Sequence, residues 1–330
     1  MKLDLRSLSL LAAAAMVTAM AGPAWSAKPA PKPAGDPVLN AETAKVMREA
    51  AKADTRAKPA PAPVLPALSA ETIAERNAAA RGGASRWAAI KTMSISGKLD
   101  AGRERRDGGT VGGMTSSPKQ ARLDARAAAL AAAKSARQSD TKVIQLPYRV
   151  DFQRPTLMRA EVDFKGQTAV QVWDGASGWK LRPFIGRNEL EPFTAEEMRI
   201  ARSQQELDGP LINYRSKGVK VASDGTERVE GHDCYRLKLT LKDGESRRLW
   251  VDAKTFLEVK AEDQPRHFNG KDRMVYTVFD DWRPVQGLQV AHKLETRVEG
   301  VPQSNRIVFE QVALNSPIAG TRFAKPELAR

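Results

Sequence analysis

The sequence has little of what most catalytic and metal centres are made from. Its 330 residues include one cysteine, Cys234, and three histidines, His232, His267 and His292. A single cysteine excludes an intramolecular disulfide, although an exported location would permit one. No histidine stands at the spacing of a metal-binding motif. We therefore expect no metal and no other cofactor.

His232 and Cys234 alternate on one expected strand, so they share a face. Two ligands on one face could begin a zinc or copper site, but a third would have to come from elsewhere. The same face carries Arg236 and Lys238, so a partly exposed polar face is the simpler interpretation. His292 falls on the apolar face of another expected strand, as a packed or rim histidine.

Catalytic carboxylate pairs are also missing. Asp280 and Asp281 are neighbours on an expected strand, and strand neighbours point to opposite faces. Glu196 and Glu197 open an expected helix, where negative charge is favoured. No glycine-rich phosphate loop and no nucleophile elbow is present. We expect a protein that is not an enzyme; an active site assembled from scattered residues is the alternative.

Long apolar runs are absent beyond the N-terminus. Residues 8–21 are apolar but too few to span a bilayer. Together with the basic start Met1–Arg6 and the small residues around Ser26, they predict a signal peptide at residues 1–26, with an N-terminal anchor as the alternative. Cys234 is far from the cleavage site, so the chain is not expected to be acylated there as a lipoprotein. We expect a soluble periplasmic monomer without a transmembrane segment after cleavage.

The net charge of +14 is unevenly distributed. Residues 1–145 have 23 Lys and Arg against 12 Asp and Glu, whereas residues 146–330 have 30 against 27. A nucleic-acid surface would place the basic residues on the folded domain, and export removes that partner. We expect no nucleic acid as partner, while weak attraction to anionic membranes stays open.

The rest of the chain divides into a linker and one domain at residues 69–330. Residues 27–68 are rich in Pro and Ala and predict an extended linker, interrupted by a short helix at 41–53. Residues 100–141 are rich in Ala, Arg and Lys and predict an exposed helical insertion in a loop between strands. A tolerated insertion is the simpler interpretation; a charged arm that contacts a membrane or a partner is the alternative.

Two helices should precede the first strand. Ser69 is the expected N-cap of a helix that ends at Arg81, before Gly82-Gly83. A second short helix at Ser85–Ile90 leads into a strand that begins near Met93.

Acidic or amide residues followed by glycine punctuate the second half of the chain. Such pairs favour the positive φ of tight hairpin turns. Between them apolar and polar residues alternate, which is typical of strands with one dry and one wet face. We predict one antiparallel meander from about Leu146 to about Asn315. The pairs are Asp174-Gly175, Asp224-Gly225, Glu230-Gly231, Asp243-Gly244, Asn269-Gly270 and Glu299-Gly300.

One helical stretch interrupts the meander. Thr194 and Glu197 have the form of a capping box, and the helix should run to Glu206 and continue briefly to Tyr214 after Gly209-Pro210. This helix, with those at 69–90, should cover part of the dry face. A large twisted antiparallel sheet capped by a few helices is an α+β architecture.

Because few helices serve many strands, part of the dry face should remain as a pocket for irregular apolar ligands such as acyl chains. The candidate ligand-binding residues are Tyr148, Val150, Phe152, Met158, Val162, Phe164, Val170, Val172, Trp179, Leu181, Met198, Leu237, Leu239, Leu249, Val251, Leu288, Val290 and Leu294.

Short motifs around the expected turns form a series. They are Gly82–Gly97, the hairpin from Arg149-Val150-Asp151 to Arg159-Ala160-Glu161, Val172-Trp173-Asp174-Gly175 with Gly178-Trp179, Val229–Leu237, Leu249–Asp252, Trp282–Leu288 and Phe323–Pro326. Over about 69–326 this series resembles the LolA/LolB-like carriers, periplasmic proteins that sort lipoproteins to the outer membrane. A periplasmic anti-sigma-factor regulator shares their fold.

The resemblance implies a LolA-like half-barrel of antiparallel strands with helices as a lid over a hydrophobic cavity. It also implies a carrier, or transport chaperone, that binds acyl chains or lipoprotein without catalysis. A lipid-sensing regulatory module that contacts an envelope protein is the alternative. An inner- or outer-membrane protein partner, the identity of the ligand and the counterpart of the carriers' cavity arginine stay open.

Overall fold

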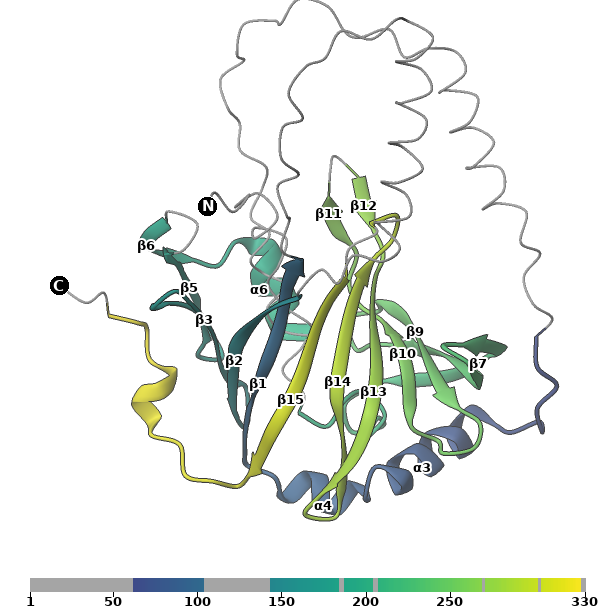
Figure 1. The fold of residues 1–330 in the computed structure, drawn as a ribbon. Coiled ribbons are helices and arrows are strands. Elements are labelled where there is room, and N and C mark those ends of the chain that lie inside the picture. The colour runs from purple at the N-terminus through teal and green to yellow at the C-terminus, as the bar shows by residue number, and fades with distance from the viewer. Residues whose placement is uncertain are drawn as a thin grey trace, which may run out of the picture.

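The structure is a computed structural model, shown in Figure 1. The residues that it describes are 62–103, 143–183, 187–203, 207–268, 271–301 and 304–327. The predicted signal peptide, the helix at 41–53 and most of the predicted insertion lie outside these residues. None of the described helices is long and apolar enough to cross a membrane.

A large open antiparallel sheet dominates the fold, as the sequence predicts. Its order is β6-β5-β4-β3-β2-β1-β15-β14-β13-β10-β9-β8-β7. These strands are β1 (Thr92–Arg103), β2 (Val143–Gln153), β3 (Leu157–Phe164), β4 (Gln167–Trp173), β5 (Gly178–Arg182), β6 (Arg187–Pro192), β7 (Lys220–Val229), β8 (His232–Thr240), β9 (Ser246–Asp252), β10 (Glu258–Glu262), β13 (Val275–Val285), β14 (Leu288–Val298) and β15 (Ser304–Leu314).

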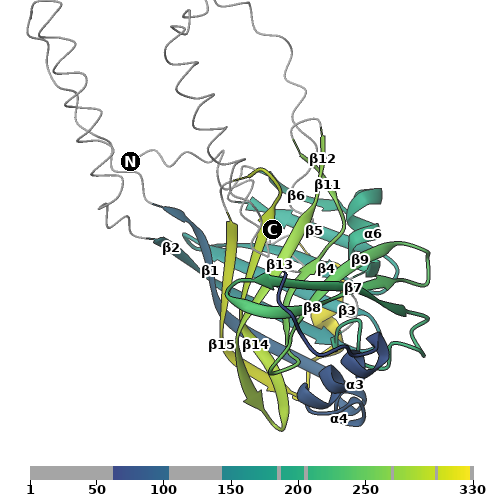
Figure 2. The same cartoon turned by 90° about the vertical axis from the view of Figure 1, so that its right-hand side faces the viewer.

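The described helices are few: α3 (Ala70–Ala80), α4 (Ala84–Ala89), α6 (Ala195–Ser203) and the short 3-10 helix η3 (Gly320–Phe323). Figures 1 and 2 show α3 and α4 across one end of the strands. A separate hairpin of β11 (Arg266–Phe268) and β12 (Lys271–Arg273) projects at the other end.

The path of the chain differs from the single meander that the sequence predicts. Strands β1 to β6 step outward to one edge of the sheet, and the chain then crosses through α6 to β7 at the opposite edge. Strands β7 to β15 step back until β15 pairs with β1, with Ile95 opposite Val312. The sheet is therefore two meanders joined along β1 and β15, and α6 lies on the crossing.

Four of the predicted turns join neighbouring strands: Asp174-Gly175, Glu230-Gly231, Asp243-Gly244 and Glu299-Gly300, each with its glycine at positive φ. Asp224-Gly225 does not form a turn. It lies inside β7, where the pairing with β8 shifts between Ser223 and Thr226, so its positive φ serves a β-bulge. Asn269-Gly270 lies outside the described residues.

The helix starts follow the predicted capping. The Ser69 hydroxyl accepts from the Thr72 amide at 3.1 Å and caps α3. In α6 the Thr194 amide donates to Glu197 Oε2 at 2.7 Å, and the Glu197 amide donates to Thr194 Oγ1 at 3.2 Å. The predicted continuation of this helix to Tyr214 is wrong, because residues 212–218 form turns. The side chains of Leu211 and Ile212 are nevertheless buried there.

Glycine is required where α3 ends. Gly82 has φ +102°, and a Cβ there would lie 2.4 Å from the carbonyl oxygen of Gly287 in the β13–β14 turn. The Gln289 amide also donates to the Arg81 carbonyl at 3.2 Å. These contacts join the helical end of the domain to β14.

Two large apolar clusters fill the concave side of the sheet. One is centred on β1–β3, β14 and Trp87, and the other lies between α3 and β7–β9. A third, smaller cluster holds Cys234 with Val229, Trp250 and Val259. The interpretation of the Cys234 face as a partly exposed polar face is therefore corrected for Cys234, which is fully buried, whereas His232 is exposed.

The end of the predicted linker lies against the domain. Leu65 and Leu68 pack on the cluster beneath α3. Thr226 Oγ1 donates to the Pro63 carbonyl at 2.8 Å, and Tyr235 Oη donates to the Pro66 carbonyl at 3.1 Å. Contacts with the domain thus begin about six residues before Ser69, where the sequence predicted the ordered domain to begin.

Candidate functional site

A cavity of about 830 Å³ opens on the concave face of the sheet. Its wall comes from seven strands of both meanders, β1, β2, β8, β9, β10, β13 and β14, and from Phe309 of β15. Arg81 and Trp87 close the end beside α3 and α4, while Leu207, Pro210 and Val219 line it from the segment that follows α6.

The end of the cavity beside α3 and α4 is mostly apolar. Met93 of β1, Phe152 of β2 and Trp282 of β13 line it where their strands approach the helices. Trp87 is 1% exposed, and its Nε1 donates to the Arg81 carbonyl at 2.9 Å. Phe279 and Trp282 pack together with ring centroids 6.2 Å apart.

One buried cation, Arg81, interrupts this apolar end. Its guanidinium lies between two indoles, 4.7 Å from the ring centroid of Trp87 and 5.1 Å from that of Trp282. Nη1 donates to Glu258 Oε1 at 2.7 Å, and Nε donates to the Gln289 carbonyl at 3.3 Å. A buried charge is tolerated when it is paired and hydrogen-bonded, so Arg81 ties α3 to β10 and β14.

The opposite end of the cavity is polar. It is lined by Lys242 and Asp243 of the β8–β9 turn, by Arg247 and Arg248 at the start of β9, by Glu262 and Asp263 at the end of β10, and by Arg202 of α6.

Two of these polar side chains, Arg248 and Asp263, bind residues of neighbouring strands. Arg248 Nη1 lies 3.2 Å from Glu262 Oε1. Asp263 Oδ2 accepts from Thr277 Oγ1 at 2.6 Å, and burial raises the pKa of this carboxyl, although its hydrogen bond with Thr277 and the nearby Arg266 and Arg247 act in the opposite direction.

Seven of the predicted ligand-binding residues line the cavity, from four strands: Tyr148, Val150, Phe152, Leu239, Leu249, Val290 and Leu294. Seven others belong to the apolar clusters around it but are not part of its wall: Met158, Val162, Phe164, Met198, Leu237, Val251 and Leu288.

The remaining four predicted residues, Val170, Val172, Trp179 and Leu181, lie on the opposite face of the sheet. Val162 pairs with Ala169 and Met158 with Trp173, so Ala169, Gln171 and Trp173 share the concave face. Their alternates therefore point outward. On this outer face Lys325 Nζ lies 4.0 Å from the ring centroid of Trp179.

The prediction of one apolar face fails at β4 because both faces are buried there, and at β5 because the apolar side chains lie on the outer face. Val170 and Val172 are 4% and 0% exposed, so alternation of apolar residues does not tell the inner face from the outer. On β5 the inner face carries Lys180 opposite Gln171. Lys180 Nζ lies 2.6 Å from Glu197 Oε1 of α6, and both side chains are buried. The pair holds α6 against the sheet.

Sequence patterns missed several residues of the cavity wall. Arg81, Trp87 and Trp282 were noted as parts of turns or helices but not as wall residues, because their contacts join segments about 200 residues apart. Phe279 could have been predicted from the sequence, because this aromatic residue precedes the polar Asp280 in a run of residues with high β-propensity. For the charged residues at the polar end, no sequence pattern indicated a place in the cavity wall.

The histidines have local roles. His232 Nδ1 lies 2.8 Å from Asp252 Oδ2, and His267 Nδ1 lies 3.0 Å from Asp272 Oδ1. His292 is buried beside the carbonyl of Val290, at 2.9 Å. Within the described ranges no group of three or more His, Cys, Asp or Glu residues could hold a metal ion.

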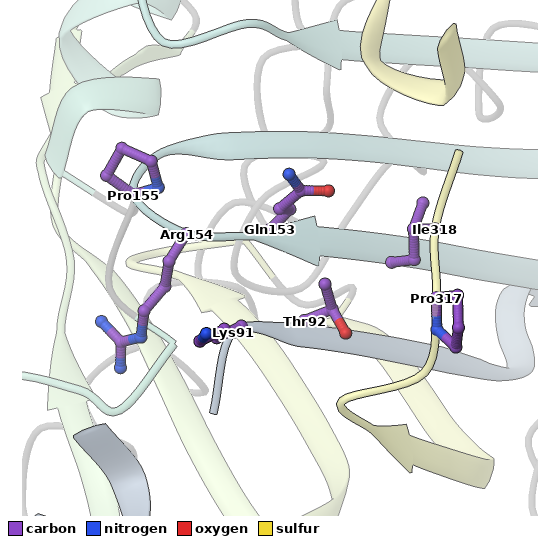
Figure 3. A pocket seen from close by; sticks show the side chains of 7 residues that line it. All are labelled: Lys91, Thr92, Gln153, Arg154, Pro155, Pro317 and Ile318. Carbon is purple, nitrogen blue, oxygen red and sulfur yellow. The ribbon is translucent and has the colours of Figure 1, made fainter. Parts of the chain in front are cut away.

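A second hollow, of about 700 Å³, lies where the ends of β1 and β2 meet the C-terminal segment (Figure 3). Lys91, Thr92 and Gln153 face Pro317 and Ile318 across it. Arg154 at its edge is engaged: Nε donates to the Ile90 carbonyl at 2.8 Å, and Nη2 lies 3.1 Å from Asp208 Oδ2. This hollow lacks the aromatic wall of the concave cavity.

The fold is similar to those of solved proteins of the LolA superfamily. A LolA superfamily protein from Nitrosomonas europaea is 14% identical, with a TM-score of 0.44, over 78% of this chain and 99% of that protein. An outer membrane lipoprotein-sorting protein domain from Vibrio parahaemolyticus is 10% identical, with a TM-score of 0.43, over 78% and 96%.

A weaker similarity is to the MucA/MucB complex of Pseudomonas aeruginosa, at 11% identity and a TM-score of 0.23, over 77% of this chain and 60% of that one. No model of a known protein family and no curated protein matches the sequence.

Proposed function

We propose that this protein is a periplasmic carrier that shelters acyl chains, free or attached to a lipoprotein, in the concave cavity for sorting to the outer membrane. The observation that carries the proposal is the cavity of about 830 Å³ with an aromatic and aliphatic wall from both meanders. Pockets that bind small ligands typically have about 300–1,000 Å³ and a mostly apolar lining.

Apolar burial would supply the affinity. Each methylene removed from water contributes about 0.8 kcal/mol, so an extended acyl chain gains most of its binding free energy from wall contacts alone. Side chains such as Phe152, Phe279 and Trp282 offer broad faces for such contacts. No covalent step is required, in keeping with a binding protein and not an enzyme.

For an acyl chain to enter the cavity, one of the segments that cover the concave face would have to move. We place this movement at α6 and residues 207–219, hereafter the lid, because Leu207, Gly209, Pro210 and Val219 line the cavity from outside the sheet. The lid consists of a helix of nine residues and of turns that pair with no strand in the described part of the chain, so it can move without breaking the strand pairing of the sheet.

The test is binding of a fluorescent fatty-acyl probe to delipidated protein. Phe279→Ala removes an aromatic wall from the cavity and should weaken binding about tenfold. Trp179→Ala removes an aromatic side chain of similar burial from the outer face and should leave the affinity unchanged. Equal losses in both variants, or no binding by the unaltered protein, would contradict the proposal.

Native mass spectrometry of protein purified from the periplasm provides a second readout. Retained lipid or acylated protein supports a carrier. A stable envelope-protein partner without lipid would instead favour the lipid-sensing regulatory module.

A further inference from the structure

The cavity changes character along the direction of its strands. β9, β10 and β13 each contribute apolar or paired residues near α3 and α4, and charged or polar residues at the other end. On β13 the order is Thr277, Phe279 and Trp282; on β10, reversed in direction, it is Glu258, Ala261 and Glu262. A ligand that fits this wall has an apolar tail and a polar head.

The charges of the wall are not balanced. Its basic residues are Arg81, Arg202, Lys217, Lys242, Arg247 and Arg248, and its acidic residues are Asp243, Glu258, Glu262 and Asp263. Arg81 is paired with Glu258, Lys217 with Asp208, and Arg248 with Glu262 and Asp224. These pairs leave Arg202 and Lys242 without a carboxylate partner within the described ranges. Arg247 is paired only with Glu245, which lies outside the wall and is shared with Arg199. All three cations belong to the polar end.

Arg202 and Lys242 are exposed and have no carboxylate partner among the described residues. Arg247 is different, because its side chain is 14% exposed. Nη2 lies 3.3 Å from Glu245 Oε2, while Nε is buried and has no acceptor in the described part of the chain. A buried donor without an acceptor is costly and indicates a place for an acceptor that the protein itself does not supply.

The two acidic residues of the polar end that form no ion pair with another described residue, Asp243 and Asp263, accept hydrogen bonds from other groups of the protein. Asp243 Oδ1 accepts from the Glu245 amide at 3.0 Å and so stabilises its own turn. Asp263 is partly buried, and its Oδ2 accepts a hydrogen bond from Thr277 Oγ1 at 2.6 Å. The polar end therefore combines excess positive charge with an unused donor.

We propose that the polar end of the cavity binds the anionic head, a carboxylate or a phosphate, of an amphipathic lipid whose tail lies toward Trp87 and Trp282. Arg247 would donate from its buried Nε, and Arg202 and Lys242 would supply charge from α6 and from the β8–β9 turn. Because α6 and the turn would contact the same head, an anionic ligand also holds the lid closed. This inference rests on the proposed function and specifies its ligand.

The experiment compares lipids that differ only in the head. Palmitic acid and hexadecanol share a tail, as do lysophosphatidylglycerol and lysophosphatidylcholine, and each is used to displace the fluorescent acyl probe. The anionic member of each pair should bind about tenfold more tightly at low salt, and the difference should shrink as salt is added. Equal affinity within both pairs overturns the anionic head while leaving the acyl cavity in place, whereas no displacement by any lipid overturns the proposed function as well.

Variants test the residues. The double substitution Arg202→Gln with Lys242→Gln alters two exposed side chains and should reduce the preference for the anion about fivefold, and Arg247→Gln should reduce it further. Lys220→Gln with Lys238→Gln removes the same charge from two exposed positions of β7 and β8 outside the cavity wall, and should leave the preference intact. Loss of preference in that control to the same degree would overturn the assignment, since only net charge would then matter.

Inorganic phosphate separates a lipid head from a free anion. Phosphate alone should not displace the acyl probe at concentrations where lysophosphatidylglycerol does, because the tail supplies most of the affinity. Displacement by phosphate at those concentrations would overturn the lipid assignment in favour of a small-anion site.

Discussion

Two covers close the concave face, and they are built differently. At one end of the strands α3 and α4 bury Ile73, Ala74 and Trp87, and Arg81 links them to β10 and β14 through an ion pair and a backbone carbonyl. On the other side α6 is shorter and depends on the buried Lys180–Glu197 pair. In α6 the only buried apolar side chain of the described residues is Ile200, while Met198 and Ala201 are partly buried, so this helix should leave the sheet at a lower free-energy cost than α3 and α4.

Arg81→Ala should have the largest effect on stability. It leaves Glu258 buried without its cation and empties the space between two indoles, so the free energy of unfolding should fall by about 3–5 kcal/mol. Chemical denaturation followed by tryptophan fluorescence measures this change. A loss below about 1 kcal/mol would show that the α3–α4 cover is not held by this residue.

Lys180→Met should cost about 3 kcal/mol, because Glu197 stays buried without its cation. The double variant Lys180→Met with Glu197→Leu should recover most of that loss, since a buried pair replaced by apolar residues is often neutral. Equilibrium unfolding of the two single variants and the double variant gives the coupling between them. Additive losses would contradict a joint that depends on the pair.

Amide hydrogen exchange compares the two covers directly. Without ligand, residues 195–203 should exchange at least about tenfold faster than residues 70–80, because α6 opens locally while α3 opens with the whole domain. Palmitic acid should slow exchange in α6 and leave α3 nearly unchanged. Equal protection of both helices in the ligand-free protein would contradict the distinction between a fixed α3–α4 cover and a movable lid.

The helix caps offer the smallest test. Ser69→Ala and Thr194→Ala each remove one side-chain acceptor from a helix start, worth about 1 kcal/mol. In α3 the loss should appear as lower global stability, and in α6 mainly as faster local exchange. A global loss from Thr194→Ala as large as that from Ser69→Ala would mean that α6 unfolds together with the domain.

Local signals in the sequence were sufficient to predict the helix starts and most of the hairpin turns. The hydroxyl of Ser69, the capping box at Thr194 and four acid–glycine turns act within a few residues, so the sequence pattern predicts them. The bulge at Asp224-Gly225 uses the same dipeptide for another purpose, and only its pairing with β8 distinguishes the two.

Long-range features could not be derived in this way. The two meanders join where β1 meets β15, and nothing near Ile95 indicates a partner at Val312. On β4 both faces are buried, and on β5 the inner face carries the buried Lys180 while apolar side chains lie outside. Alternation therefore assigns Val170, Val172, Trp179 and Leu181 to the wrong face. The sandwich of Arg81 between Trp87 and Trp282 depends on the completed sheet, and a charged residue at a helix end resembles any other in sequence.

The burial of Cys234 makes the molecule convenient for distance measurements. Burial raises the pKa of its thiol to about 12, so at neutral pH the reactive thiolate is scarce and thiol reagents should leave this residue unmodified. A spin label or fluorophore can then be attached at one chosen position, for example through Arg199→Cys on α6, without first replacing the natural cysteine. Motion of α6 on addition of lipid could be followed in the otherwise unaltered protein.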